Sequence, residues 1–160
     1  MRLYLVQHGE AQPEAVSPER ELSPQGRVDV GRLADFLGSR GVRAARVVHS
    51  GKTRARQTAE ILAARLAPGT APEVLAGLNP NDPVPPVAAQ ARDWHEDTLL
   101  AGHLPFMGRL ATVLVAGRED PAALAFQPGS IACLERNPAA GWEVVWMLRP
   151  ELLPEPPAEA

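Results

Sequence analysis

Apolar and polar positions alternate along the chain in a way that predicts strands followed by helices. Residues 2–7 form a short apolar run that ends at His8, a pattern typical of a buried strand leading into a functional loop. Residues 24–37 carry apolar side chains at helical spacing. Ser23 is suited to cap this helix and Pro24 to occupy its first turn. We therefore predict a strand over 2–7 and a helix over 24–37.

The same alternation continues along the rest of the chain. Strands are predicted at 45–49, 73–75 and 98–101, helices at 53–66, from the turn 79–83 to about 94 and at 107–115, and a hairpin from 130–134 and 142–148. Strands that alternate with helices imply a three-layer α/β fold, in which helices flank a mostly parallel central sheet. We expect a single compact domain over 1–150, without insertions, and a flexible tail over 151–160 that is rich in proline and glutamate.

Composition narrows the function classes. The chain has 160 residues, enough for one core, and is 45% apolar and 22% charged, as soluble globular proteins are. No apolar run is long enough to span a membrane, and nothing at the N-terminus is typical of an export signal. We therefore expect a cytoplasmic protein that does not bind membranes. The net charge of −3 argues against general nucleic-acid binding, which needs a basic face.

Polar residues follow three of the predicted strands. His8, Ser50 and His103 each come just after a strand, and open α/β sheets place ligand sites beyond the carboxyl ends of their strands. Arg54 lies in the first turn of the helix that follows Ser50, where backbone N–H groups and the helix dipole favour an anion. These loops together predict a site for an anionic group.

The residue types at this site suit phosphoryl transfer. A neutral imidazole such as that of His8 can attack phosphorus and divide one difficult displacement into two easier ones. The guanidinium of Arg54 can hold phosphoryl oxygens through paired hydrogen bonds, and His103 can donate another. His8 by itself is also consistent with an ordinary loop residue, so the prediction depends on the whole set.

The motifs around these residues resemble those of the histidine phosphatase superfamily. Residues 3–10 (LYLVQHGE) are similar to its Arg-His-Gly signature, and residues 50–59 (SGKTRARQTA) to its Ser-Pro-x-x-Arg-Ala-x-Gln-Thr-Ala segment. Residues 102–105 (GHLP) and 21–26 (ELSPQG) resemble motifs of the SixA branch, the phosphohistidine phosphatases. The four motifs occur in the family's order and extend over about the first 115 residues.

This resemblance implies a phosphoglycerate mutase-like fold and a role for each matching residue. His8 would form a phosphohistidine intermediate, Arg54 and His103 would bind the phosphoryl group, and Gln7 and Ser50 are candidates for further phosphate contacts. The substrate would be a phosphohistidine on a phosphorelay protein, such as a phosphorylated histidine-containing phosphotransfer domain. No metal or cofactor is implied, and we expect a monomer.

Two positions depart from the family pattern. Gln7 stands where the family has arginine, so charge and a bidentate contact are lost and weaker phosphate binding is expected. The general acid is not obvious: Asp82 and Glu10 are candidates, and Asp82 could instead cap a helix. Two alternatives therefore remain open, namely a phosphomonoesterase acting on a small molecule and a catalytically weak module that binds phosphate or phosphoproteins.

Overall fold

The core of the molecule is a six-stranded sheet, shown by a computed structural model that describes residues 1–139 and 141–155. Its strands are β1 (Arg2–Gln7), β2 (Arg46–His49), β3 (Glu73–Val74), β4 (Thr98–Gly102), β5 (Ile131–Asn137) and β6 (Gly141–Leu148). Their order is β3-β2-β4-β1-β5-β6. The first four strands in this order are parallel, and β5 pairs antiparallel with both β1 and β6.

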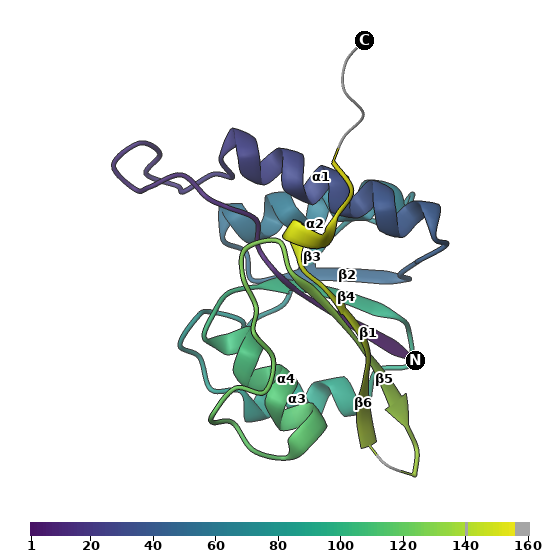
Figure 1. The fold of residues 1–160 in the computed structure, drawn as a ribbon. Coiled ribbons are helices and arrows are strands. Elements are labelled where there is room, and N and C mark those ends of the chain that lie inside the picture. Colours follow the sequence, from purple (N-terminus) through teal and green to yellow (C-terminus); the bar gives the residue numbers. More distant parts are fainter. Residues whose placement is uncertain (140, 156–160) are drawn as a thin grey trace.

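Helices cover both faces of the sheet (Figure 1). The helices are α1 (Pro24–Ser39), α2 (Thr53–Leu66), α3 (Pro85–Arg92) and α4 (Phe106–Ala116). On one face α1 packs against α2, and on the other α3 packs against α4. Two buried apolar clusters fill the two interfaces, with Leu3 and Leu5 on the α3–α4 side and Tyr4 and Val6 on the α1–α2 side. This three-layer α/β architecture confirms the predicted fold class.

The strand register brings the predicted site loops together. Gln7 of β1 pairs with Gly102 of β4, and His49 of β2 pairs with Ala101 of β4. His8, Ser50 and His103 are each within one or two residues of these pairs in the sequence. The site therefore lies at the carboxyl ends of three adjacent parallel strands.

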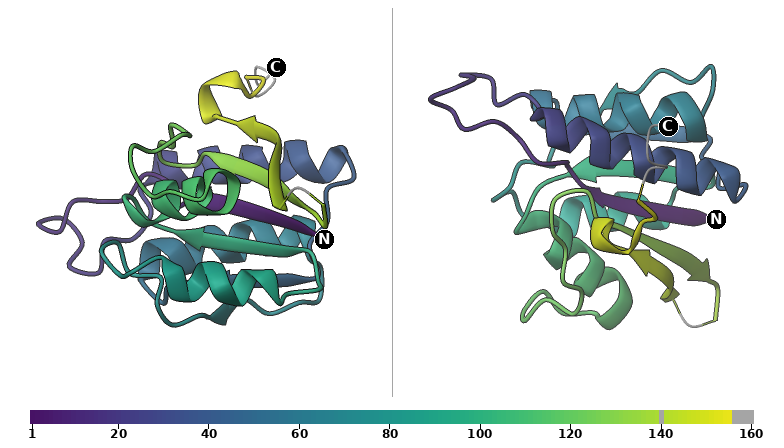
Figure 2. Two further views of the ribbon diagram at one scale, coloured as in Figure 1. Left: turned by 90° about the horizontal axis from the view of Figure 1, so that it is seen from below. Right: turned by 45° about the horizontal axis from the view of Figure 1, so that its top comes forward.

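The segment between β1 and α1 projects beyond this edge of the sheet (Figures 1 and 2). A bridge between Ala11 and Leu22 holds its two limbs together. Ser23 caps α1 as predicted: its Oγ accepts from the N–H of Gly26 at 2.9 Å and donates to Glu10 Oε1 at 2.8 Å. This cap links the start of α1 to the loop that follows His8.

The structure differs from the predicted elements near residue 80 and at the C-terminus. Helix α3 begins at Pro85 rather than at the turn 79–83, because the prolines at 85 and 86 suit a first helical turn. Residues Pro150–Leu152 form a 3-10 helix, and Leu153 is buried against the α1–α2 side of the core. The chain is thus attached to the domain beyond residue 150, and residues 156–160 of the predicted tail lie outside the described residues.

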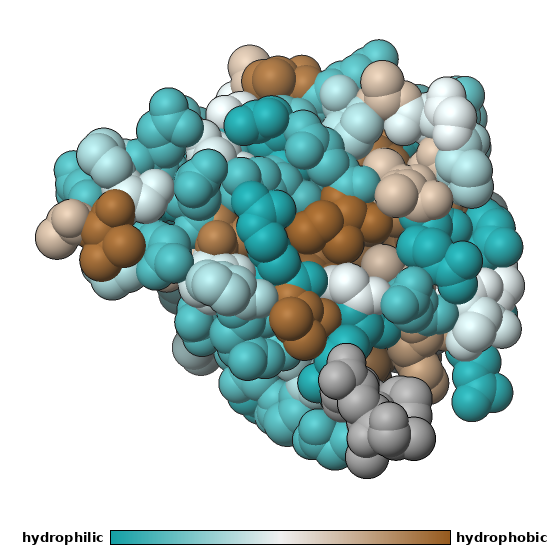
Figure 3. Space-filling model, turned by 90° about the horizontal axis from the view of Figure 1, so that it is seen from above, coloured by the Kyte–Doolittle hydropathy of each residue, from teal (hydrophilic) through white to brown (hydrophobic). Residues whose placement is uncertain are grey.

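The outer face of α1 and α2 is mostly hydrophilic, with a few separate apolar areas (Figure 3). This is the pattern expected of amphipathic helices that bury one side against a sheet. In the described ranges, 1–139 and 141–155, no helix combines the length and the apolar character needed to cross a membrane.

Gly26 is the point of closest approach between α1 and the loop after His8, and this predicts a sharp effect of substitution. A Cβ at Gly26 would collide with the backbone of Glu10, whereas a Cβ at Gly31 on the same helix would meet nothing within 4 Å. We expect Gly26→Ala to lower the free energy of unfolding by about 1–3 kcal/mol through overpacking, as measured by urea denaturation.

Gly31→Ala is the matched control. It should leave that free energy unchanged or raise it by up to about 1 kcal/mol, because alanine favours helix over glycine. Equal effects of the two substitutions would contradict the close approach.

Candidate functional site

His8 lies immediately after β1, with its backbone N–H bonded to Gly102 O at 3.0 Å. Its Nδ1 is 2.7 Å from Gly9 O. A carbonyl oxygen can only accept, so Nδ1 carries the ring proton of the neutral imidazole and Nε2 has the lone pair. Nε2 in turn accepts from Arg54 Nε at 3.3 Å. The nitrogen available to attack phosphorus is thus Nε2, and it faces a guanidinium.

The surroundings of His8 keep its imidazole neutral. Burial is the main cause that lowers the pKa of His8 from 6.5 to about 4, and the charges of Arg54 and Arg20 lower it further, while the hydrogen bond to Gly9 opposes them. An unprotonated ring at neutral pH is what a nucleophile requires.

Arg54 stands at the start of α2, where the helix begins without a side-chain cap. Burial and the charge of Arg20 lower the pKa of its guanidinium, which nevertheless stays protonated because an arginine pKa is so high. The uncapped N–H groups and the guanidinium both favour an anion at this end of the helix. Arg54 is therefore positioned to bind an anionic group next to His8 Nε2.

His103 is the second histidine of the site and is only 1% exposed. Its ring centroid is 5.0 Å from that of His8, and its Nε2 lies 2.6 Å from Ser50 Oγ. Burial, followed by the effects of His8 and nearby cations, lowers the pKa of His103 to about 3. Its Nδ1 has no hydrogen-bond partner within the described part of the chain. The structure thus brings His8, Arg54, His103 and Ser50 together.

Gln7 is buried at the end of β1. Side chains alternate between the two faces of a strand, so Gln7 shares the α3–α4 side with Leu3 and Leu5. Its Oε1 has no partner among residues 1–139 and 141–155, and over those ranges the amide makes no hydrogen bond to His8, Arg54 or His103. A phosphate contact from Gln7 remains a prediction.

The two candidate acids are both held by other groups. Glu10 Oε1 accepts from Ser23 Oγ at 2.8 Å, and Asp82 Oδ2 accepts from the backbone N–H of Asn79 at 2.9 Å. Within the described residues, neither carboxylate contributes to the pKa of His8 or His103. Asp82 stabilises its own turn and does not cap α3, whose N-cap is Val84.

The sequence interpretation missed three polar residues of the site region, namely Thr58, Gln57 and Arg20. Thr58 is fully buried, and its Oγ1 accepts from the Gly9 N–H at 3.0 Å and donates to Arg54 O at 2.8 Å. Thr58 therefore links the loop after His8 to the helix that carries Arg54. The signal was available, because Gln57 and Thr58 lie next to Ala59 on the apolar face of α2.

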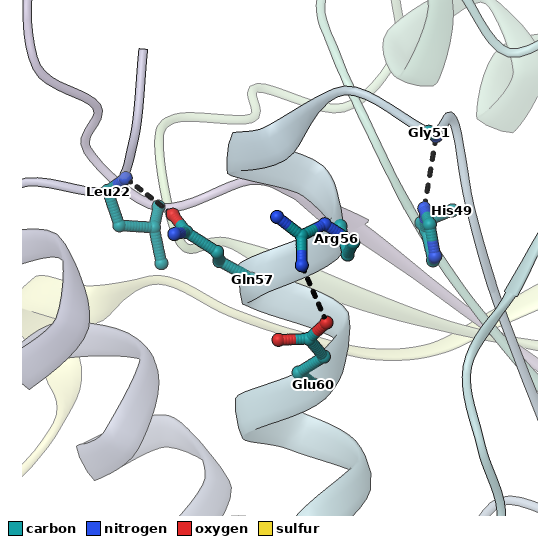
Figure 4. Close-up of polar contacts among 6 residues, drawn as sticks. All are labelled: Leu22, His49, Gly51, Arg56, Gln57 and Glu60. Atoms are coloured by element: carbon teal, nitrogen blue, oxygen red, sulfur yellow. Dashed lines mark hydrogen bonds and ion pairs between the residues drawn. The ribbon is translucent and has the colours of Figure 1, made fainter. Parts of the chain in front are cut away.

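Gln57 and His49 fix the loops around α2 (Figure 4). Gln57 Oε1 accepts from the Leu22 N–H at 2.8 Å, and His49 Nδ1 accepts from the Gly51 N–H at 3.0 Å. Arg56, by contrast, pairs with Glu60 at 3.2 Å on the exposed side of the helix. The third missed residue, Arg20, lies in the loop between β1 and α1.

Comparison with known proteins identifies the family. The model of the histidine phosphatase superfamily, branch 1, matches residues 3–80. An uncharacterized protein of Picosynechococcus sp. is 33% identical over 125 residues, which are 74% of this chain and 75% of that protein. The chain belongs to the histidine phosphatase superfamily. This confirms the resemblance inferred from the motifs and, at the level of the family, the expectation of an enzyme.

Two further relatives belong to the SixA branch. Phosphohistidine phosphatase SixA of Escherichia coli (strain K12) is 28% identical over 155 residues, 94% of each chain. The structure of the protein histidine phosphatase SixA complexed with tungstate superposes with a TM-score of 0.81 at 28% identity, covering 94% of this chain and 97% of that chain. The similarity to SixA therefore extends over nearly the whole domain.

The buried, neutral state of His8 predicts its titration. An NMR titration should give a pKa near 4 for His8 in the folded protein, whereas histidines of the urea-unfolded chain should titrate near 6.5. The unfolded chain then binds the proton at higher pH than the folded one, so the free energy of unfolding should fall as the pH is lowered from about 6.5 towards 4. Titration of folded His8 near 6.5 would contradict this account.

Thr58 allows a direct test of how the loop after His8 is held in place. Thr58→Val removes the acceptor for the buried Gly9 N–H, which should cost about 1–3 kcal/mol in the free energy of unfolding and speed hydrogen exchange of the Gly9 amide. Thr58→Ser keeps the hydroxyl and should preserve slow exchange. Equal exchange in all three proteins would contradict the role of Thr58.

Proposed function

We propose that this protein is a phosphohistidine phosphatase that removes the phosphoryl group from a histidine of a phosphorelay protein. The observation that carries the proposal is the neutral His8, whose Nε2 faces Arg54 at 3.3 Å while His103 lies beside it. Similarity to SixA over 94% of the chain supports the same substrate class.

In the proposed reaction, His8 Nε2 attacks the phosphorus of the substrate phosphohistidine. A bond forms between Nε2 and phosphorus as the bond to the substrate imidazole breaks. The substrate ring is protonated on its other nitrogen before the step, so it leaves as neutral imidazole. Arg54 compensates the charge on the phosphoryl oxygens, and the hydrogen-bonded pair of His103 Nε2 and Ser50 Oγ donates one hydrogen bond to them. Water then attacks phosphorus, which releases inorganic phosphate and regenerates His8.

The positions of the carboxylates support a phosphoramidate substrate. Glu10 is bonded to Ser23 and Asp82 to Asn79, and within the described residues neither carboxylate is hydrogen-bonded to His8, Arg54 or His103. Protonated imidazole leaves easily, whereas an alkoxide needs a well-placed general acid. This difference favours phosphohistidine over a small phosphate ester as the substrate.

The proposed partner is a phosphorylated histidine-containing phosphotransfer domain in the cytoplasm. His8 and Arg54 are only partly buried, so the reacting atoms are within reach of a side chain presented by another protein. The reaction needs no metal or organic cofactor, because His8 supplies the nucleophile and Arg54 the compensating charge. We expect the enzyme to act as a monomer.

The test is loss of phosphate from such a domain, phosphorylated on its histidine with a radioactive label. Wild-type protein should release labelled inorganic phosphate, and His8→Ala should be slower by at least about 1,000-fold, since removing a nucleophile abolishes the covalent route. Asp82→Asn is the control and should retain activity. Equal inertness of the wild type and His8→Ala would overturn the proposal.

The alternatives give different results in the same assays. A small-molecule phosphomonoesterase would hydrolyse p-nitrophenyl phosphate readily and lose that activity in Asp82→Ala. A binding module would retain the phosphorylated domain without releasing phosphate. Gln7→Arg should raise activity if the missing charge limits turnover.

A further inference from the structure

Arg20 has an unusual backbone conformation. Its φ is 52°, and it is the one residue other than glycine with a positive φ among residues 1–139 and 141–155. This left-handed region is unfavourable for a long side chain and is tolerated much better by glycine and asparagine. Residues held in such conformations concentrate at binding and catalytic sites, where a side chain must be aimed in a particular direction.

The surrounding loop holds Arg20 in place. Its N–H donates to Ser17 O at 2.9 Å, and its Nε donates to Gln12 O at 3.2 Å on the opposite limb. Two residues later, the Leu22 N–H is bound by Gln57, which lies one turn of α2 beyond Arg54. The side chain of Arg20 is therefore anchored at Nε, and the backbone at Leu22 is tied to the helix that carries Arg54.

The remaining donors of this guanidinium are available to a ligand. In the part of the chain that the structure describes, Nη1 and Nη2 of Arg20 make no hydrogen bond, and no carboxylate forms an ion pair with the group. Arg20 is also only partly buried. Two parallel N–H groups without a partner can donate paired hydrogen bonds to two oxygens of a phosphoryl group.

Arg20 is close enough to the site to act on each of its main groups. Its charge lowers the pKa of His8, of Arg54 and of His103, and in the described residues it is the one charged side chain common to all three. Lys52, by comparison, acts on His103 alone of the three. Arg20 is bonded to Gln12, four residues after His8, and its loop is held to α2 through Leu22 and Gln57, so its guanidinium lies in the neighbourhood of the site.

We propose that Arg20 binds the phosphoryl group at His8 as the second guanidinium of the site, in place of the arginine that Gln7 replaces. The charge comes from the loop before α1 rather than from the end of β1. The inference rests on the proposed function only in its choice of a phosphoryl group as the ligand, because binding of an inert oxyanion tests it independently of turnover.

Arg20→Asn is the informative substitution, since asparagine removes the guanidinium and accepts the left-handed backbone. Binding of tungstate, measured by calorimetry, should weaken about 10- to 100-fold, the loss expected for a hydrogen-bonded charge on an anion. Arg20→Lys should bind with intermediate affinity, because the charge remains and the paired donors do not. His8 should titrate at higher pH in Arg20→Asn.

Arg56→Asn is the matched control. It removes the same charge from the same end of the molecule, but Arg56 is exposed and paired with Glu60. Tungstate affinity should change less than about 2-fold, and the pKa of His8 should not move, because exposed charges are screened by salt. Equal losses in the two variants would show a general effect of net charge and overturn the proposal.

A double-mutant cycle with Gln7→Arg tests whether the two positions serve the same role. If an arginine at position 7 takes over the phosphoryl contact, Arg20→Asn should cost much less affinity in that background than in the wild type. Full additivity would show that Arg20 does not substitute for the missing arginine.

The outcomes separate this inference from the proposed function. Unchanged tungstate binding in Arg20→Asn overturns the role of Arg20, even where the wild type dephosphorylates phosphohistidine. Weakened binding supports it, even where no phosphate is released. Should Arg20→Asn melt at a lower temperature than the wild type, Arg20→Gly, which relieves the backbone strain, decides the question by the same measurement.

Discussion

The parallel hydrogen bonding of β1, β4 and β2 is the constraint on which the site depends. The register pairs Gln7 with Gly102 and His49 with Ala101, so three loops leave the sheet at one level. A shift of one residue would reverse the faces of a strand's side chains and separate His8 from His103. The apolar clusters on both faces hold this register, because every side chain of β1 from Leu3 to Val6 is buried in one or the other.

Burial and nearby positive charges both lower the pKa values of His8 and His103. Both lie among cations and have pKa values far below the ordinary range, so the site is positively charged while its imidazoles stay neutral. In the proposed function, this combination suits a dianionic phosphoryl group, because the cations attract it and the unprotonated Nε2 of His8 attacks it. The overall charge of the chain is −3, so the positive field is local to the carboxyl edge of the sheet.

Close backbone contact explains why the motifs contain small residues. Gly26 leaves space for the backbone of Glu10, and Gly9 leaves space for the side chains of Val30 and Leu22. The loop after His8 is thereby pressed against α1, while Thr58 binds it to α2. His8 is thus fixed by two helices as well as by its own strand.

Local patterns in the sequence determined the order of strands and helices, the fold class and the set His8, Arg54 and His103, because periodicity and strand-end position are properties of short segments. Thr58 and Gln57 could have been found in the same way, as polar residues on the apolar face of a helix. Only the tertiary structure decided that Ser23 and Asn79 hold the candidate acids Glu10 and Asp82, and that the loop of Arg20 folds back onto Gln12 and α2. These outcomes depend on how an irregular loop folds back on elements distant in sequence, and no repeating pattern encodes that path.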